Sequence, residues 1–286
     1  MKLLIVFALA LVWLPSSTFA IYEGDEAKIG QFPYLVRLAL VDSEGARTSC
    51  GGAIIGEKWI LTAAHCMCPY VDVENATIYM GTNERDPDDI KPVTVSKKYF
   101  ICHKDYKRFS RKNDIALIEV PSITFSTYVK AVNLPAFDIE YIPGMYEGKE
   151  VVASGWGRLS SKAEYSTDEL QYLNMTVSDT TECIKAHNSI MVNATSNICA
   201  VAPDNGSTCF GDSGGPIEEN GTVVGIVSVG TSNTCEDGRP NVFTCVHYYV
   251  QWIFDKTGIR NSPKLRLPNR NRRFRSRRVN VPRSVI

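Results

Sequence analysis

Beyond its first twenty residues the sequence lacks any long hydrophobic run. A transmembrane helix needs about 18 to 20 consecutive apolar residues, and no segment after Ala20 provides them. The first twenty residues differ, because Lys2 precedes an apolar run from Leu3 to Leu14 and small residues lead up to Ala20. This arrangement is typical of a secretory signal peptide. We therefore expect residues 1–20 to be removed and the remaining chain to be soluble, exported and extracellular.

The C-terminal segment lacks acidic residues altogether. Residues 259–286 contain ten Lys and Arg and no Asp or Glu, whereas residues 21–258 contain 20 basic and 31 acidic residues. The formal net charge of zero thus combines an acidic main unit with a basic tail. Such a tail is typical of a disordered arm that binds polyanions such as heparin-like chains, nucleic acid or anionic membranes. The alternative is a solvated extension that proteases specific for basic residues trim away.

Cysteine is absent from the signal segment and plentiful after it. All nine cysteines follow Ala20, and in an oxidising compartment such a set forms a disulfide framework. The odd number leaves at least one thiol outside the pairs within the chain. Five Asn-x-Ser/Thr sequons fit the same export route and are candidate glycosylation sites: Asn75, Asn174, Asn193, Asn205 and Asn220.

Long helical patterns and internal repeats are also absent. Short β-branched and apolar runs alternate with turn residues, as at 35–40, 115–120 and 223–227. Many short strands separated by turn signals are typical of an all-β sandwich or a pair of barrels. We expect a single helix near the end of the main unit, where residues 250–254 show helical spacing and Gly258 can end it.

Three short segments supply a nucleophile, a base and an orienting acid. Ser213 stands in Gly-Asp-Ser-Gly-Gly-Pro, His65 in Leu-Thr-Ala-Ala-His-Cys, and Asp114 in Asn-Asp-Ile-Ala-Leu. A serine hydroxyl is a weak nucleophile, so acyl transfer needs an imidazole to accept its proton and a carboxylate to fix the tautomer of that imidazole. The order His, Asp, Ser along the chain is that of chymotrypsin-type proteases.

On these motifs the chain resembles the chymotrypsin/trypsin family of secreted serine endopeptidases from Ile21 to about Gly258. The resemblance implies an all-β fold of two six-stranded antiparallel barrels with a C-terminal helix and a boundary near residues 133–135. His65 and Asp114 would come from the first barrel and Ser213 from the second, facing a cleft that takes protein or peptide substrates. It implies no cofactor and no metal ion. The alternative is a protease-like binding protein with little or no activity.

The resemblance also assigns supporting residues around the nucleophile. The backbone N–H groups of Gly211 and Ser213 would form the oxyanion hole, the pair of donors that stabilises the charged intermediate. Ser228 matches the serine that hydrogen-bonds the aspartate of the triad. A plain strand serine remains the alternative for Ser228.

Three disulfides follow from the same resemblance: Cys50–Cys66, Cys183–Cys199 and Cys209–Cys235. Cys68, Cys102 and Cys245 are left over. One interpretation joins Cys68 to Cys102 and leaves Cys245 as a buried thiol. The other is a disulfide to a second chain.

By alignment to the nucleophile, Ser207, Gly230 and Asn241 form the specificity pocket. Ser207 stands where the trypsin branch has an aspartate, so a Lys or Arg side chain would enter the pocket unpaired. Gly230 leaves one wall open to large side chains, whereas Asn241 replaces the usual glycine and should shorten the pocket or make its base polar. We expect a chymotrypsin-like preference, with an elastase-like or broad preference as the alternative.

The start of the main unit departs from the family pattern. In the family, cleavage after a basic residue frees an ammonium that pairs with the aspartate beside the nucleophile, here Asp212. This chain has Ile21 at the equivalent place, but Ala20 precedes it and Tyr22 and Glu23 replace small residues. Signal-peptide cleavage would therefore create the Ile21 terminus directly. A short propeptide removed by another protease is the alternative.

The basic tail gives a first testable prediction. Because each neutralised anionic group releases counterions, binding of the tail to a polyanion should weaken steeply with salt. A chain that ends at Gly258 should lose retention on heparin resin and keep its turnover of a short peptide. Passage of the full-length mature protein straight through the resin at low salt would contradict the polyanion interpretation, as would loss of the tail before secretion.

Overall fold

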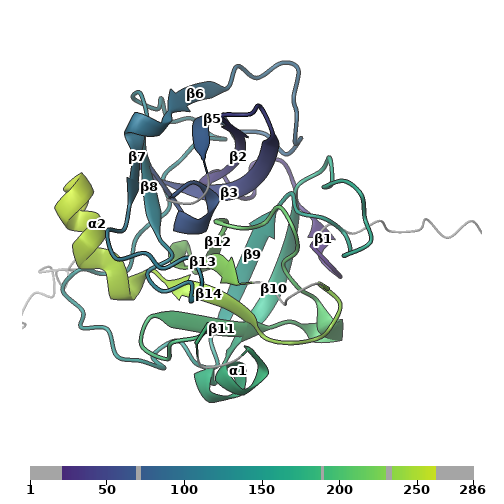
Figure 1. Cartoon of the computed structure of the whole chain (residues 1–286), viewed down its shortest axis with the longest axis vertical. Coiled ribbons are helices and arrows are strands. Elements are labelled where there is room, and N and C mark those ends of the chain that lie inside the picture. The colour runs from purple at the N-terminus through teal and green to yellow at the C-terminus, as the bar shows by residue number, and fades with distance from the viewer. Residues whose placement is uncertain (1–20, 69–71, 188–189, 230–233, 262–286) are drawn as a thin grey trace, which may run out of the picture.

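The structure is a computed structural model that describes residues 21–68, 72–187, 190–229 and 234–261. Two β-sheets lie one above the other, the N-terminal sheet in purple to blue and the C-terminal sheet in teal to green (Figure 1). The predicted signal segment, most of the basic tail and Gly230 lie outside the described residues. No helix within the described ranges is long and apolar enough to cross a membrane.

The first sheet closes on itself through one bent segment. Its order is β6-β5-β2-β3-β4-β8-β7, and the two edge strands β6 and β7 are consecutive in the chain, separated by the short 3-10 helix η2. The same segment therefore pairs with β5 at one edge and with β8 at the other, which makes a barrel. The strands are β2 (Leu35–Asp42), β3 (Arg47–Gly56), β4 (Trp59–Thr62), β5 (Val73–Met80), β6 (Val93–Ser96), β7 (Phe100–Cys102) and β8 (Ala116–Glu119), with η2 at Lys97–Tyr99.

The second sheet closes through a direct strand pair. Its order is β1-β10-β11-β14-β13-β12-β9, and β9 pairs with β10 as well as with β12. The two-residue strand β1 is an addition at the side of β10. The strands are β1 (Asp25–Glu26), β9 (Glu150–Gly155), β10 (Gln171–Ser178), β11 (Asn197–Val201), β12 (Pro216–Glu219), β13 (Thr222–Val229) and β14 (Asn241–Cys245).

The prediction of two antiparallel barrels with a C-terminal helix is confirmed. Each described sheet has seven strands rather than six, because η2 divides one strand of the first sheet and β1 extends the second. The C-terminal helix α2 (Val250–Thr257) ends at Gly258, which adopts the left-handed conformation at φ 73°. Its buried Ile253 packs into the core of the first barrel, so the end of the main unit ties back onto its beginning.

The prediction of a single helix is wrong, because α1 (Thr180–His187) lies at the outer end of the second sheet (Figure 1). The Asp179 carboxylate accepts the Thr181 N–H at 2.7 Å, as a helix N-cap does. Cys183, its one buried residue, joins Cys199 on β11. The remaining described helical segments are the short 3-10 turns η1 (Ala64–Cys66), η3 (Pro203–Asn205) and η4 (His247–Tyr249).

Four disulfides are present among the described residues. Cys68 joins Cys102, and Cys245 is a free and buried thiol, as the first of the two interpretations expects. Burial raises the pKa of the Cys245 thiol to about 11, which keeps it protonated and unreactive at neutral pH. The other three pairs are those that the resemblance implies: Cys50–Cys66, Cys183–Cys199 and Cys209–Cys235.

The two barrels meet where a glycine of β3 contacts the glycines that follow Ser213. Gly51 on β3 donates its N–H to the Ser213 carbonyl at 2.7 Å. A Cβ on Gly51 would lie 2.8 Å from the Gly215 Cα, and one on Gly214 would lie 2.7 Å from the Gly51 carbonyl and collide with Thr62. Side chains are thus excluded where β3 of the first barrel contacts the Ser213 loop of the second.

Gly214→Ala should destabilise the fold more than a matched glycine substitution elsewhere. Gly214 (φ 78°) and Gly148 (φ 74°) share the same strained backbone region, but an added Cβ meets nothing within 4 Å at Gly148. Overpacking costs about 1–3 kcal/mol, which lowers Tm by about 2–4 °C per kcal/mol in a domain of this size. Calorimetry of both variants measures the difference. Equal melting temperatures would contradict a tight contact between the barrels.

Candidate active site

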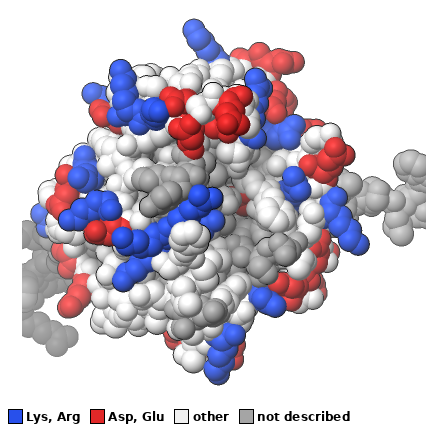
Figure 2. All heavy atoms as spheres, in the orientation of Figure 1, with Lys and Arg blue, Asp and Glu red and all other residues white. Residues whose placement is uncertain are grey.

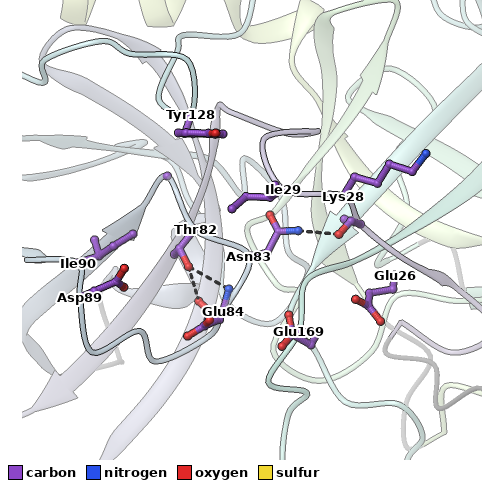
Figure 3. A pocket seen from close by; sticks show the side chains of 12 residues that line it. Glu26, Lys28, Ile29, Thr82, Asn83, Glu84, Asp89, Ile90, Tyr128 and Glu169 are labelled. Carbon is purple, nitrogen blue, oxygen red and sulfur yellow. Dashed lines mark hydrogen bonds between the residues drawn. The ribbon is translucent and has the colours of Figure 1, made fainter.

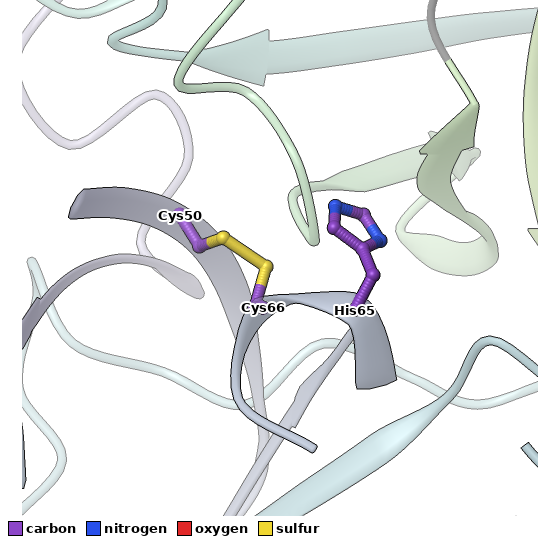
Figure 4. Close-up of side chains that lie close together, drawn as sticks. All are labelled: Cys50, His65 and Cys66. Atoms are coloured by element: carbon purple, nitrogen blue, oxygen red, sulfur yellow. A yellow bond between two sulfur atoms is a disulfide. The ribbon is translucent and has the colours of Figure 1, made fainter. Parts of the chain in front are cut away.

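His65 lies on the 3-10 turn η1, directly after β4. The Cys50–Cys66 disulfide ties this turn to β3 and lies beside the imidazole (Figure 4). The two sulfurs are bonded to each other, so they are not available as thiolate ligands for a metal ion. The disulfide therefore acts as a covalent support for the backbone that carries His65.

Asp114 is a fully buried carboxylate that accepts hydrogen bonds from both barrels. Its Oδ2 lies 2.8 Å from His65 Nδ1, and its Oδ1 accepts the His65 backbone N–H at 2.8 Å. From the second barrel, the Ser228 hydroxyl donates to Oδ2 at 2.6 Å. The Thr244 hydroxyl donates to the Asp114 backbone carbonyl at 2.8 Å. The geometry thus places Ser228 where the resemblance expects it.

These partners keep Asp114 ionised. Burial alone would raise the pKa of this carboxyl, but the neighbouring His65 and the hydrogen bonds from His65 and Ser228 outweigh burial and lower it. An ionised carboxylate only accepts hydrogen bonds, so His65 Nδ1 carries a proton. When the imidazole is neutral, its Nε2 is then the nitrogen that can accept a proton.

Ser213 and His65 line the same cavity, of about 300 Å³. The structure therefore brings together all three residues that the sequence motifs single out, because Asp114 is bonded to His65 behind this cavity. Ser213 comes from the loop between η3 and β12, and His65 from the first barrel. The other described residues that line it are Arg111, Met191, Thr208, Cys209, Phe210, Val227, Ser228, Val229 and Cys235.

In the loop around Ser213, the backbone N–H groups of Gly211 and Ser213 have no carbonyl partner among the described residues. Asp212, Gly214 and Gly215 donate to the carbonyls of Cys209, Val227 and Asp212, whereas no backbone acceptor is recorded for Gly211 or Ser213. Gly211 has φ 107°, a conformation that a residue with a Cβ rarely adopts. Ser213 lines the cavity, and Gly211 directly follows Phe210, which also lines it.

The expected specificity residues Ser207 and Asn241 are buried and bonded to each other and to Thr208. Asn241 Oδ1 accepts the Thr208 N–H at 2.9 Å and the Thr208 hydroxyl at 2.7 Å, and the single proton of the Ser207 hydroxyl is shared between the Thr208 carbonyl at 2.9 Å and Asn241 Oδ1 at 3.1 Å. The two donors of Thr208 fix the orientation of the amide, and Asn241 Nδ2 has no hydrogen-bond partner within the described part of the chain. Thr208 also lines the cavity, and its described lining residues include no Asp or Glu.

Asp212 is a second fully buried carboxylate, in a different environment. It accepts the N–H groups of Gly157 and Cys209 at 2.8 Å each, and no cation pairs with it among the described residues. Burial raises its pKa from 3.8 to about 7, although the two N–H groups favour the charged form. A Cβ on Gly155 or Gly157 would collide with this carboxylate, so the surrounding backbone is shaped around it.

Ile21 is fully buried in the core of the second barrel. Tyr22, the next residue, accepts the Ser207 N–H through its carbonyl at 3.0 Å, which links the start of the main unit to the specificity residues. Ile21 has φ 53°, an unusual value for a β-branched residue.

Sequence reasoning missed three residues at this site. Arg111 and Phe210 line the cavity, and Thr244 bonds to Asp114. Arg111 and Phe210 are close in sequence to Asp114 and Ser213, which is the one signal that could have drawn attention to them. Nothing in the sequence distinguishes Thr244 from other strand threonines.

A larger cavity, of about 730 Å³, lies away from these residues beside β1 and β10. Its described lining residues include four carboxylates, Glu26, Glu84, Asp89 and Glu169, and no serine, cysteine or histidine (Figure 3). It therefore lacks the pairing of a serine with an imidazole that the sequence motifs provide. The smaller cavity with His65 and Ser213 is the one suited to acyl transfer.

Two β-barrels that hold a histidine, a buried carboxylate and a serine around one cavity define a serine hydrolase of the two-barrel class. The sequence matches the Trypsin family over residues 21–253. The chain belongs to this family and is a serine-type endopeptidase.

Named relatives agree with this assignment. The chain is 34% identical over 272 residues to a collagenase of Hypoderma lineatum, a match that covers 91% of this chain and 99% of that protein. It is 34% identical over 242 residues to brachyurin of Leptuca pugilator, a match that covers 84% of this chain and 99% of brachyurin.

Solved structures give the same result. HL collagenase aligns with a TM-score of 0.74 at 32% identity, covering 84% of this chain and all of that one. A scabies mite inactivated protease paralogue aligns with a TM-score of 0.69 at 27% identity, and the alignment covers 83% of this chain and 97% of the paralogue. The second likeness shows that the fold also occurs in a protein described as inactivated, so the argument for catalysis depends on the residues of the site.

The unpaired Asp212 predicts a stability that depends on pH in any form with residues attached before Ile21. The folded state keeps this proton up to about pH 7, whereas the unfolded chain releases it near 3.8, so the unfolding free energy should decrease as pH rises through that window. Three pKa units correspond to about 4 kcal/mol. Asp212→Asn should remove this part of the pH dependence. The measurement is the melting temperature of the extended wild type and of the extended Asp212→Asn variant between pH 4 and pH 7. The same change of melting temperature with pH in both proteins would contradict the prediction.

Proposed function

We propose that this chain is an exported serine endopeptidase in which Ser213 attacks the peptide carbonyl and His65 accepts its proton. Asp114 would orient His65 and stabilise the imidazolium, and acylation of Ser213 would be followed by hydrolysis of the acyl-enzyme. The observation that carries the proposal is the buried Asp114 carboxylate bonded to His65 Nδ1, which directs Nε2 to its role as base. Protein or peptide substrates are those that the family acts on.

The oxyanion hole in this proposal consists of the Gly211 and Ser213 N–H groups. Their lack of backbone acceptors among the described residues supports this role, since the N–H groups of Asp212, Gly214 and Gly215 in the same loop are bonded to carbonyls. Donors held in place before the reaction stabilise the developing negative charge without reorganising. Removal of one such donor costs about 3 kcal/mol in related chemistry.

We further propose that the mature chain begins at Ile21 and that its ammonium pairs with Asp212. The burial of both residues and the raised pKa of Asp212 support this pairing, because an unpaired buried carboxylate costs about 3–5 kcal/mol. In a chain that begins at Ile21 the ammonium would lower the pKa of Asp212. Edman sequencing of secreted, active protein tests the proposal, and a first residue other than Ile21 would contradict it.

We propose a preference for Leu, Met, Phe or Tyr before the scissile bond, in the chymotrypsin-like or elastase-like range. Thr208, Ser207 and Asn241 supply hydroxyl and amide groups but no charge to pair with Lys or Arg. The side chain of Asn241 is expected to keep the pocket short. A cleavage profile dominated by Lys or Arg would contradict this preference.

The proposed nucleophile is tested directly by substitution. Wild-type protein should react with a fluorophosphonate probe at Ser213, and Ser213→Ala or His65→Ala should each lower kcat by at least about 10³-fold, because the triad acts as a unit. Ser122→Ala, at an exposed serine outside this cavity, is the matched control and should change neither readout. Peptide hydrolysis by Ser213→Ala within about tenfold of wild type would contradict the assignment. Absence of both labelling and hydrolysis in the wild type would instead favour a protease-like binding protein.

A further inference from the structure

A basic hairpin contributes one residue to the described lining of the cavity that contains Ser213. Between β7 and β8 the chain turns back on itself, with the Lys107 N–H donating to the Lys112 carbonyl at 3.0 Å. Five of the nine residues from Lys104 to Lys112 are Lys or Arg, and Asp105 is the one acidic residue among them. Figure 2 shows basic side chains gathered across the middle of this face, at the level of the loop between β7 and β8 in Figure 1.

This local charge is opposite to that of the main unit, which has 20 basic and 31 acidic residues between positions 21 and 258. A cluster of one sign beside a cleft raises the local concentration of ligands of the other sign. The hairpin is therefore suited to attract acidic chains to an otherwise acidic protein.

Arg111 is the residue of the hairpin that reaches the catalytic cavity. It lines the cavity together with His65 and Ser213 and is half-buried. Its one recorded hydrogen bond goes to the neutral Tyr106 hydroxyl at 3.4 Å, and no carboxylate forms an ion pair with it among the described residues. A guanidinium in such a place can bind an incoming carboxylate through two parallel hydrogen bonds.

A second cation without a recorded ion pair among the described residues contacts Phe210, another lining residue of the cavity. Phe210 lines the cavity, and the Arg158 guanidinium lies over its ring at 5.5 Å. Arg158 also lines a groove of about 680 Å³ that shares Phe210 with the cavity. Within the described residues no ion pair is recorded for Arg158, whereas Arg37 in the same groove is paired with Asp86.

We propose that this site selects peptides with Asp or Glu close to the scissile bond, and that Arg111 is the main residue that recognises the acidic side chain. Arg158, over the Phe210 ring, provides a second, weaker contact. The inference rests on the proposed endopeptidase function and adds a substrate class to it. It differs from the proposed preference for Leu, Met, Phe or Tyr directly before the scissile bond, because it concerns the other substrate residues close to that bond.

The test is a set of synthetic peptides with one common cleavage site and Ala, Glu or Lys at each of the three positions on either side. Wild-type protein should hydrolyse at least one Glu peptide with a kcat/KM about fivefold or more above the matching Ala peptide, as expected for a charged, partly shielded contact. The Lys peptide at that position should be the poorest. Raising NaCl from about 0.05 M to about 0.5 M should reduce the ratio of Glu to Ala, because exposed charges are screened.

Substitutions identify the residue responsible. Arg111→Gln should bring the ratio of Glu to Ala close to one, and Arg111→Lys should keep part of it, since the charge remains but the planar guanidinium is lost. Lys130→Gln changes the net charge equally at an exposed residue outside the cavity and should leave the ratio unchanged. If Arg111→Gln fails to fold, Arg158→Gln and the salt dependence of the wild type still test the inference.

Equal hydrolysis of Ala and Glu peptides by the wild type would overturn the inference and leave the proposed function intact. So would an unchanged ratio in Arg111→Gln, which would mean that Arg111 only packs against Tyr106. Failure of the proposed function is a separate outcome, in which no peptide is cleaved and the fluorophosphonate probe does not react.

Discussion

A negative charge buried between two barrels is the constraint on which the rest of the structure depends. Asp114 comes from the first barrel, yet the hydroxyls of Ser228 and Thr244 reach it from β13 and β14 of the second. An isolated buried carboxylate would take up a proton, and its hydrogen bonds prevent this. Docking of the second barrel therefore adds to the stabilisation that His65 gives to the ionised Asp114 carboxylate. That arrangement also brings the Ser213 loop against Gly51 on β3.

The two buried aspartates show how environment separates residues of the same type. Asp114 has a histidine and a serine as partners, and its pKa is lowered, whereas Asp212 accepts two backbone N–H groups and its pKa is raised to about 7. Carboxylates whose pKa values move apart commonly have different roles. Asp114 is suited to orient an imidazole throughout a reaction cycle. Asp212 is suited to bind a cation, which we propose is the ammonium of the new N-terminus.

Much of the site could be predicted from the sequence because its residues stand in contiguous motifs. His65, Asp114 and Ser213 each lie within a short segment whose order along the chain is informative. The alternating apolar runs predicted an all-β fold, and the family resemblance on these motifs implied the two barrels. Helix α1 was missed because Thr180–His187 is short and largely polar and depends on a cap and a disulfide. The spacing of apolar residues does not reveal a helix that is stabilised by a cap and a disulfide.

Arg111 could not be assigned from the sequence for a different reason. The basic run at residues 104–112 is visible, but such runs usually form solvated faces. Only the fold of the hairpin distinguishes Arg111, which lines the cavity, from Lys104 and Lys112, which are exposed. Contacts between distant segments, such as Thr244 with Asp114, are likewise a property of the docked barrels.

The most direct test of this account is nitrogen NMR of the His65 imidazole in the wild type, at a pH where the ring is neutral. The account predicts a proton on Nδ1, held by Asp114, and an unprotonated Nε2 that faces the cavity with Ser213. Asp114→Asn should disturb this tautomer, because the amide can offer a donor where the carboxylate only accepts. A wild-type imidazole with its proton on Nε2 would contradict the central claim that the buried carboxylate prepares His65 to act as a base.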